Sequence, residues 1–142
     1  MADRNDFRVF RPVQTRWGDD DAYGHVNNVI YYAYFDTAVN GFLFERTGTD
    51  IRRLPAIGVV VETSCRYSRS ISFPDELEAG LAVERLGDRS VTYQLGIFIR
   101  GESTSVAEGR FVHVYVDART RQSTAIPDII RQAVSPLLLE KP

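Results

Sequence analysis

Apolar and polar residues alternate along much of the second half of the chain, which is the pattern of strands with one buried face. Four segments rich in β-branched and aromatic residues predict strands at 58–67, 77–86, 90–100 and 103–116. A looser alternation over 7–14, interrupted by Pro12, predicts a further strand at a sheet edge or with a bulge. The short links at 87–89 and 101–102 predict hairpins, so these strands should be antiparallel neighbours.

The segment 28–45 follows a different pattern. It contains no proline and carries apolar residues on more than one face, which is typical of a helix enclosed by other structure. The segment 126–139 predicts a closing helix that Pro136 should end or kink. One long helix followed by antiparallel strands predicts an α+β fold in which the sheet wraps around the helix.

Composition and charge narrow the class of protein. The 142 residues are enough for a single domain, 1–142, and the 44% apolar and 25% charged fractions are those of globular chains. A net charge of −2 and scattered arginines argue against nucleic acid as a partner. The charged start and the lack of an apolar run near the roughly 18 residues of a membrane span predict a cytoplasmic protein that has no membrane partner. The lone cysteine, Cys65, excludes an internal disulfide.

Residues suited to chemistry gather between the first strand and the helix, in the stretch 17–28. Three consecutive acids, Asp19 to Asp21, precede His25 and the pair Asn27-Asn28. We predict that Asn27 caps a helix starting at Asn28, whose free first-turn N–H groups could bind an oxyanion. A purely structural interpretation stays open, because acids before a helix also interact favourably with its dipole. The spacing matches neither a calcium loop nor a zinc helix, so we predict no metal site.

A resemblance sharpens this interpretation. Residues 21–28, Asp-Ala-Tyr-Gly-His-Val-Asn-Asn, followed by aromatic residues and an acid at 31–36, resemble the signature of hotdog-fold acyl-CoA thioesterases of the 4-hydroxybenzoyl-CoA thioesterase type. The resemblance continues at 73–77, Phe-Pro-Asp-Glu-Leu, and at Arg89-Ser90, so it covers nearly the whole chain in the same order. It implies a hotdog fold, with an antiparallel sheet wrapped around a long central helix, and edge-to-edge homodimers with acyl-thioester sites at the subunit interface.

The resemblance also implies roles for individual residues. Asp21 acts on the thioester carbonyl carbon, either as a nucleophile or as a general base for water, and the residues leave both open. The backbone N–H of Asn28 binds the thioester oxygen, and one such donor is typically worth ~3 kcal/mol in the transition state. The substrate-binding residues that the resemblance implies are Gly24, Asn27, Tyr31 and Arg89, with Arg89 near the coenzyme A phosphates.

His25 has a second parallel. The stretch is similar to the Asp-x-Asn-x-His-Val-Asn-Asn string of plant acyl-carrier-protein thioesterases, but Tyr23 stands where those proteins have asparagine. His25 is therefore a candidate for orienting a water molecule, and bonding of the loop backbone is its alternative role.

The predicted function is hydrolysis of an acyl-CoA thioester to free acid and CoA, with no cofactor beyond the coenzyme A of the substrate. The predicted assembly is a homodimer or a dimer of dimers. The alternative is a hotdog protein that binds acyl-CoA or acyl-carrier protein without hydrolysing it. The residues leave open the acyl group and the choice of coenzyme A or acyl-carrier protein as donor.

Overall fold

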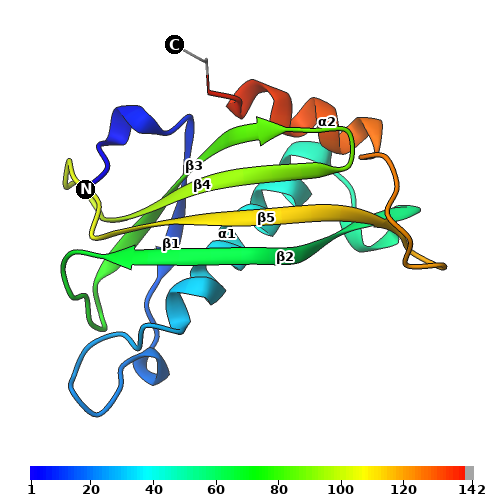
Figure 1. Ribbon diagram of the computed structural model, residues 1–142. Coiled ribbons are helices and arrows are strands. Elements are labelled where there is room, and N and C mark those ends of the chain that lie inside the picture. Colours follow the sequence, from blue (N-terminus) through cyan, green and yellow to red (C-terminus); the bar gives the residue numbers. More distant parts are fainter. Residues whose placement is uncertain (140–142) are drawn as a thin grey trace.

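The computed structural model describes residues 1–139, so the last three residues of the predicted domain 1–142 lie outside the described residues. Its strands form one antiparallel sheet in the order β1-β3-β4-β5-β2 (Figure 1). The strands are β1 (Val9–Gln14), β2 (Ala56–Tyr67), β3 (Glu76–Leu86), β4 (Ser90–Ile99) and β5 (Ala107–Asp117). The helices are α1 (Ile30–Thr47) and α2 (Asp128–Val134), and short 3₁₀ turns cover Arg4–Asp6, Trp17–Asp19, Ile51–Arg53 and Ser135–Leu137.

The predicted element types are confirmed, whereas some boundaries are wrong. The last strand begins at Ala107 rather than at residue 103, because the residues before it pair with the N-terminus. Ser105 N–H donates to the Ala2 carbonyl at 2.9 Å, and Thr104 forms an isolated bridge with Asp3. The closing helix ends at Val134, and the 3₁₀ turn that contains Pro136 follows it, as the proline predicted.

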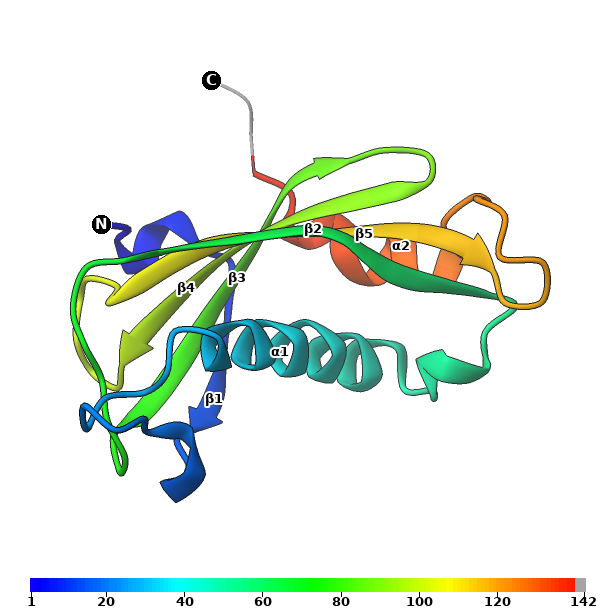
Figure 2. The same cartoon turned by 60° about the horizontal axis from the view of Figure 1, so that its bottom comes forward.

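The sheet curves around α1, which runs along its concave face (Figure 2). The packing of α1 on β5 depends on Gly109, because a Cβ atom there would lie 2.5 Å from Cε2 of the buried Phe35 ring. The helix ends at Thr47 and is capped by Gly48, whose φ of 67° is a left-handed conformation that glycine adopts without strain. In the part of the chain that the structure describes, no helix is long and apolar enough to cross a membrane.

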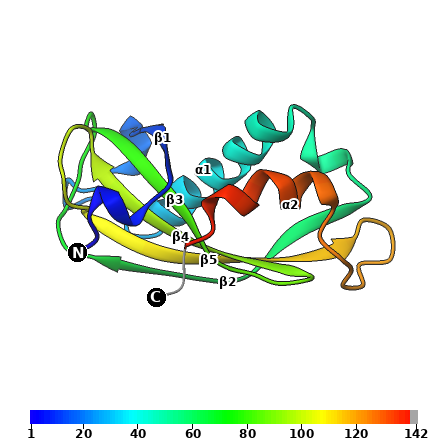
Figure 3. The ribbon, with the colours of Figure 1, turned by 90° about the horizontal axis from the view of Figure 1, so that it is seen from above.

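The antiparallel register gives the sheet two ends that are used below. The Tyr67 end holds the end of β2 and the start of β5, where Tyr67 pairs with Ala107. The Arg89 end holds the start of β2, paired with the end of β5, and the β3–β4 hairpin that carries Arg89. The loop 15–29 lies at the Tyr67 end, whereas α2 packs beside the C-terminal half of α1 (Figures 2 and 3).

Candidate active site

A buried carboxylate anchors the loop that leads into α1. Asp19 is only 1% exposed and accepts hydrogen bonds from the Tyr34 hydroxyl at 2.7 Å and from the Arg16 side chain at 3.0 Å. Burial alone would raise the pKa of Asp19, but the hydrogen bonds from Tyr34 and Arg16 outweigh burial and lower it. The ionised carboxylate therefore ties the loop to the first turns of the helix.

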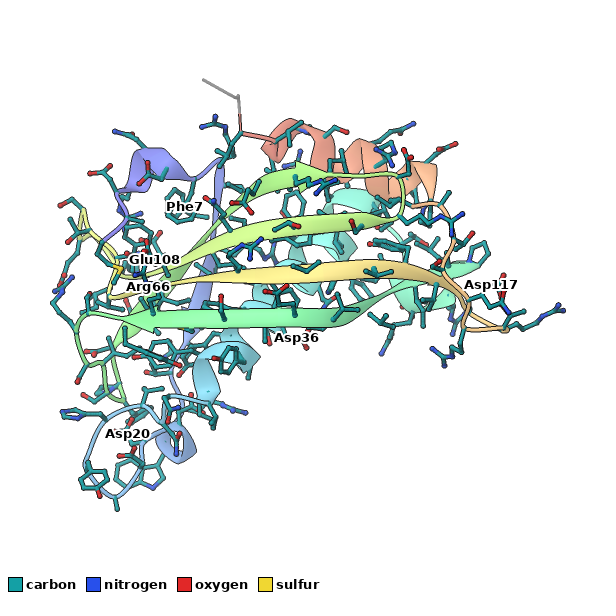
Figure 4. All side chains as sticks on the ribbon, viewed as in Figure 1. Phe7, Asp20, Asp36, Arg66, Glu108 and Asp117 are labelled. Atoms are coloured by element: carbon teal, nitrogen blue, oxygen red, sulfur yellow. The ribbon has the colours of Figure 1, made fainter. Side chains whose placement is uncertain are left out.

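The next acid fastens the same loop to the segment before β3. The Asp20 carboxylate accepts the Phe73 N–H at 3.0 Å, and the Val26 N–H donates to the Ile71 carbonyl at 2.8 Å. Figure 4 shows Asp20 within this loop, at the opposite end of the sheet from Asp117. The loop is thus held on two sides, and the residue between these anchors, Asp21, has a defined position.

Asp21 lies at the base of a tight turn. Its N–H donates to the His25 carbonyl at 2.9 Å, and one carboxylate oxygen accepts the Tyr23 N–H at 2.9 Å. Gly24 has a φ of 79°, a left-handed conformation that closes this turn and favours glycine. Within residues 1–139 the other carboxylate oxygen, Oδ2, accepts no hydrogen bond, so it is available for chemistry.

The Asp21 side chain borders an open hollow of about 310 Å³ at the Tyr67 end. The hollow is bounded by the start of α1 on one side and by the end of β2 on the other. Its lining is Asp21, Val26, Asn28, Tyr31, Tyr67, Ser68, Arg69 and Ser70. The structure therefore brings together three residues of the predicted site: Asp21, Asn28 and Tyr31.

The start of α1 differs from the prediction in its first residue and in its cap. The helix begins at Ile30 rather than at residue 28, and Asn27 is not its N-cap. Instead, the Asn27 side chain accepts the Val29 N–H at 3.1 Å, and its carbonyl accepts the Ile30 N–H, forming a turn before the helix. Among the described residues the Asn28 N–H has no acceptor, and Asn28 borders the hollow. A free donor is therefore present where the oxyanion site was predicted, supplied by this turn.

Tyr67 is a residue of this site that sequence reasoning missed. Its hydroxyl donates to the Asn28 carbonyl at 2.8 Å, and its ring lies edge-on to Tyr31, with 4.9 Å between the ring centres. Burial raises the pKa of Tyr31 to about 12 and the pKa of the neighbouring Cys65 thiol to about 11. The thiol is therefore protonated at neutral pH, and Cys65 lacks the thiolate that a nucleophile needs.

Four other predicted site residues do not line the hollow: Gly24 and Asn27, which form the turns described above, and His25 and Arg89. His25 is exposed, and only its backbone carbonyl takes part in the turn among the described residues. Arg89 lies at the opposite end of the sheet from the hollow, where its guanidinium donates to the Ser123 hydroxyl at 2.9 Å. Within a single copy Arg89 therefore does not join Asp21. Residues 1–139 contain no group of three or more His, Cys, Asp or Glu side chains that could hold a metal ion.

Comparison with known proteins places this geometry in a family. Residues 15–134 match the model of the thioesterase-like superfamily. The PA5185 protein of Pseudomonas aeruginosa is 50% identical, with a TM-score of 0.92 over 95% of this chain and 94% of that one. PA2801, a putative thioesterase of the same species, is 30% identical, with a TM-score of 0.80 over 87% and 95% of the two chains.

The gentisyl-coenzyme A thioesterase BH1999 shares the fold at 24% identity, with a TM-score of 0.77 over 88% of this chain and 98% of that one. The sheet wrapped around one helix is the hotdog fold expected from the sequence. The chain belongs to the thioesterase-like superfamily.

Proposed function

We propose that the protein hydrolyses acyl-CoA thioesters at the hollow beside Asp21. The observation that carries the proposal is that Asp21, which has a free carboxylate oxygen, and Asn28, which has a free N–H, line the same open hollow. Hydrolysis of a thioester needs a group that attacks or activates water, and a donor for the oxygen that becomes negative. Asp21 supplies the first and Asn28 the second.

The chemistry has two forms that differ in the fate of the carboxylate. As a nucleophile, Asp21 attacks the carbonyl carbon, the CoA thiolate leaves, and water then cleaves the mixed anhydride. As a general base, Asp21 takes a proton from the water that attacks the same carbon. In both forms the Asn28 N–H stabilises the negative oxygen of the tetrahedral intermediate, and the products are a free acid and CoA.

Two copies of the chain form the complete site in this proposal. β2 is a free sheet edge of 12 residues, and its middle holds the exposed side chains of Val60 and Val61. A long apolar edge strand is a template for pairing with another strand. Antiparallel pairing of two β2 strands brings the Arg89 end of one copy to the Tyr67 end of the other, so Arg89 of the partner would approach the coenzyme A phosphates.

The deciding experiment measures free-thiol release from a panel of acyl-CoA thioesters with the wild type and with Asp21→Asn. We expect Asp21→Asn to lower kcat by at least ~10³-fold, because the amide is neither a nucleophile nor a base. Glu45→Gln is the matched control, since it removes an exposed carboxylate on α1 that pairs with Arg11. Full activity of Asp21→Asn would contradict the mechanism. Binding of acyl-CoA by a wild type that releases no thiol would favour the non-hydrolytic alternative.

A further inference from the structure

A second pocket, which we call the His113 pocket, lies at the Arg89 end of the molecule. It has a volume of about 210 Å³ and is bounded by the C-terminal half of α1, the start of β2, the end of β5 and α2. Its lining includes Leu43, Ile57, Gly58, His113, Tyr115 and Ile130. Sites for whole small-molecule ligands are usually about 300–1,000 Å³. The His113 pocket therefore fits one end of a molecule rather than a complete acyl-CoA.

The pocket has one buried polar group without a partner. His113 is only 2% exposed, and its Nδ1 has no hydrogen-bond partner among residues 1–139. Three aromatic rings, those of Tyr93, Phe111 and Tyr115, hold the imidazole, with ring centres 5.1–6.5 Å away. Buried polar atoms normally have a partner, so an unpartnered nitrogen at a pocket wall indicates a group that binds something.

His113 is suited to an uncharged ligand group. Burial lowers the pKa of His113 to about 4, so the imidazole is neutral at pH 7. A neutral imidazole can donate one hydrogen bond and accept another, which suits a hydroxyl. Nδ1 lies beside Gly58, since a Cβ atom on that glycine would be 3.0 Å from it. A side chain at position 58 would therefore pack directly on Nδ1.

The His113 pocket does not adjoin the Asp21 hollow of its own copy. Tyr31 lines the hollow and Leu43 lines the pocket, which places them roughly 18 Å apart along α1 at the rise of a helix. The two sites also lie at opposite ends of β2, because Tyr67 belongs to the hollow and Gly58 to the pocket. In two copies paired antiparallel through β2, each hollow therefore comes to the pocket of the other copy.

Resting on the function and the pairing proposed above, we infer that the His113 pocket of one copy receives the far end of an acyl group whose thioester lies at Asp21 of the other. His113 then hydrogen-bonds a hydroxyl at that end. The substrate class is an acyl-CoA thioester with an apolar acyl group that carries a hydroxyl near its far end. The apolar lining accommodates the chain, and the imidazole distinguishes it from a chain without the hydroxyl.

Subunit mixing tests whether the site is shared. Gly58→Val fills the pocket, and Asp21→Asn removes the attacking group, so each homodimer should lose at least ~90% of its turnover of ω-hydroxyoctanoyl-CoA. A heterodimer of the two variants, isolated through two different tags, contains one complete site out of two and should recover about half of the wild-type turnover. A heterodimer as inactive as its parents, an active Gly58→Val homodimer or a monomeric wild type would each overturn the inference.

His113→Phe tests the recognition of the hydroxyl with a ring that has no hydrogen-bonding atom. We expect the wild type to prefer ω-hydroxyoctanoyl-CoA over octanoyl-CoA in kcat/KM by about tenfold, as one hydrogen bond allows, and His113→Phe to abolish this preference. Tyr93→Phe is the matched control, because it removes the other buried side-chain polar atom that has no partner among residues 1–139, the Tyr93 hydroxyl, and Tyr93 does not line the pocket. An unchanged preference in His113→Phe, or an equal loss in Tyr93→Phe, would contradict the assignment.

These outcomes separate the inference from the proposed function. If the wild type hydrolyses octanoyl-CoA through Asp21 but heterodimers stay inactive and His113→Phe changes nothing, the thioesterase function stands and the pocket assignment fails. If the wild type hydrolyses no acyl-CoA thioester of the panel, both fail together.

Discussion

At the scale of single residues, the three consecutive acids before α1 have three different roles that composition alone does not separate. Asp19 is buried and bonded to Tyr34 and Arg16, whereas Asp20 holds the Phe73 N–H. Asp21 keeps one oxygen free at the edge of the hollow. Two carboxylates thus fix the loop, which leaves the third positioned for chemistry.

The Asp19 anchor predicts a stability cost for Tyr34→Phe. The variant removes one hydrogen bond to a buried carboxylate, so we expect the free energy of unfolding to fall by about 1.5–3 kcal/mol at pH 7. The pKa of Asp19 is lowered in the folded state, so its contribution is present above its ordinary pKa of 3.8 and is lost as the pH falls through the lowered value. The difference between wild type and variant should therefore shrink below about pH 4.

Urea unfolding at pH 7 and at pH 3 measures both parts of this prediction. Tyr23→Phe is the control, because the Tyr23 side chain is 87% exposed and should cost almost nothing at either pH. A cost for Tyr34→Phe that is the same at both values of pH would show that the lost hydroxyl does not act through the ionised Asp19 carboxylate, and would contradict this prediction.

At the scale of elements, the Phe35 ring of α1 packs directly on the backbone of β5 where a side chain is absent. A Cβ atom at Gly109 would collide with the Ser64 carbonyl of β2 as well as with the Phe35 ring of α1. The backbone oxygen cannot move without shifting the strand pairing. The packing of Phe35 of α1 against β5 therefore depends on this one glycine.

Gly109→Ala should consequently be strongly destabilising. We expect a loss of about 3 kcal/mol or more, since overpacking a core against backbone costs at least as much as overpacking it against side chains. The Gly18→Ala control places its new methyl group where nothing lies within 4 Å and should shift the melting temperature only slightly. Thermal unfolding followed by circular dichroism compares the two, and equal melting temperatures would show that the sheet can relax around the added methyl group.

The order and type of the elements could be predicted from the sequence, because each follows from local periodicity and from short links. The start of α1 could not, because it depends on Asn27 closing a turn and on the loop being held by Asp19. Tyr67 was missed for a similar reason. Its bond to the Asn28 carbonyl joins residues far apart in the chain, and a strand tyrosine carries no local signal of that contact.

At the scale of the whole molecule, the two sheet edges differ in a way that bears on assembly. β1 has six residues and contains Pro12, which cannot donate a hydrogen bond to a further strand. β2 has 12 residues without a proline, and its register with β5 shifts at a bulge between Val60 and Glu62, where Val61 is 57% exposed. Natural edges that stay unpaired are usually short, charged or interrupted. Despite its bulge, β2 is twice as long as β1 and exposes two adjacent valines, Val60 and Val61, so it is the edge better suited to a second copy.

The substitution Val61→Lys should therefore separate the two copies of the dimer. In a two-fold pair, residues near the middle of one β2 lie close to the same residues of the other, so Val61→Lys places like charges opposite each other. We expect sedimentation velocity to show dimers for the wild type and monomers for the variant. Turnover should fall with the dimer, because each Asp21 then loses the pocket and the Arg89 of its partner.

Ile129→Lys controls for the added charge, since Ile129 is an exposed apolar residue of α2 away from that edge. This variant should stay dimeric and active. A Val61→Lys variant that remains a dimer would place the interface elsewhere. An active monomer would mean that the hollow beside Asp21 is complete in one copy, and the Arg89 end would then have no part in catalysis.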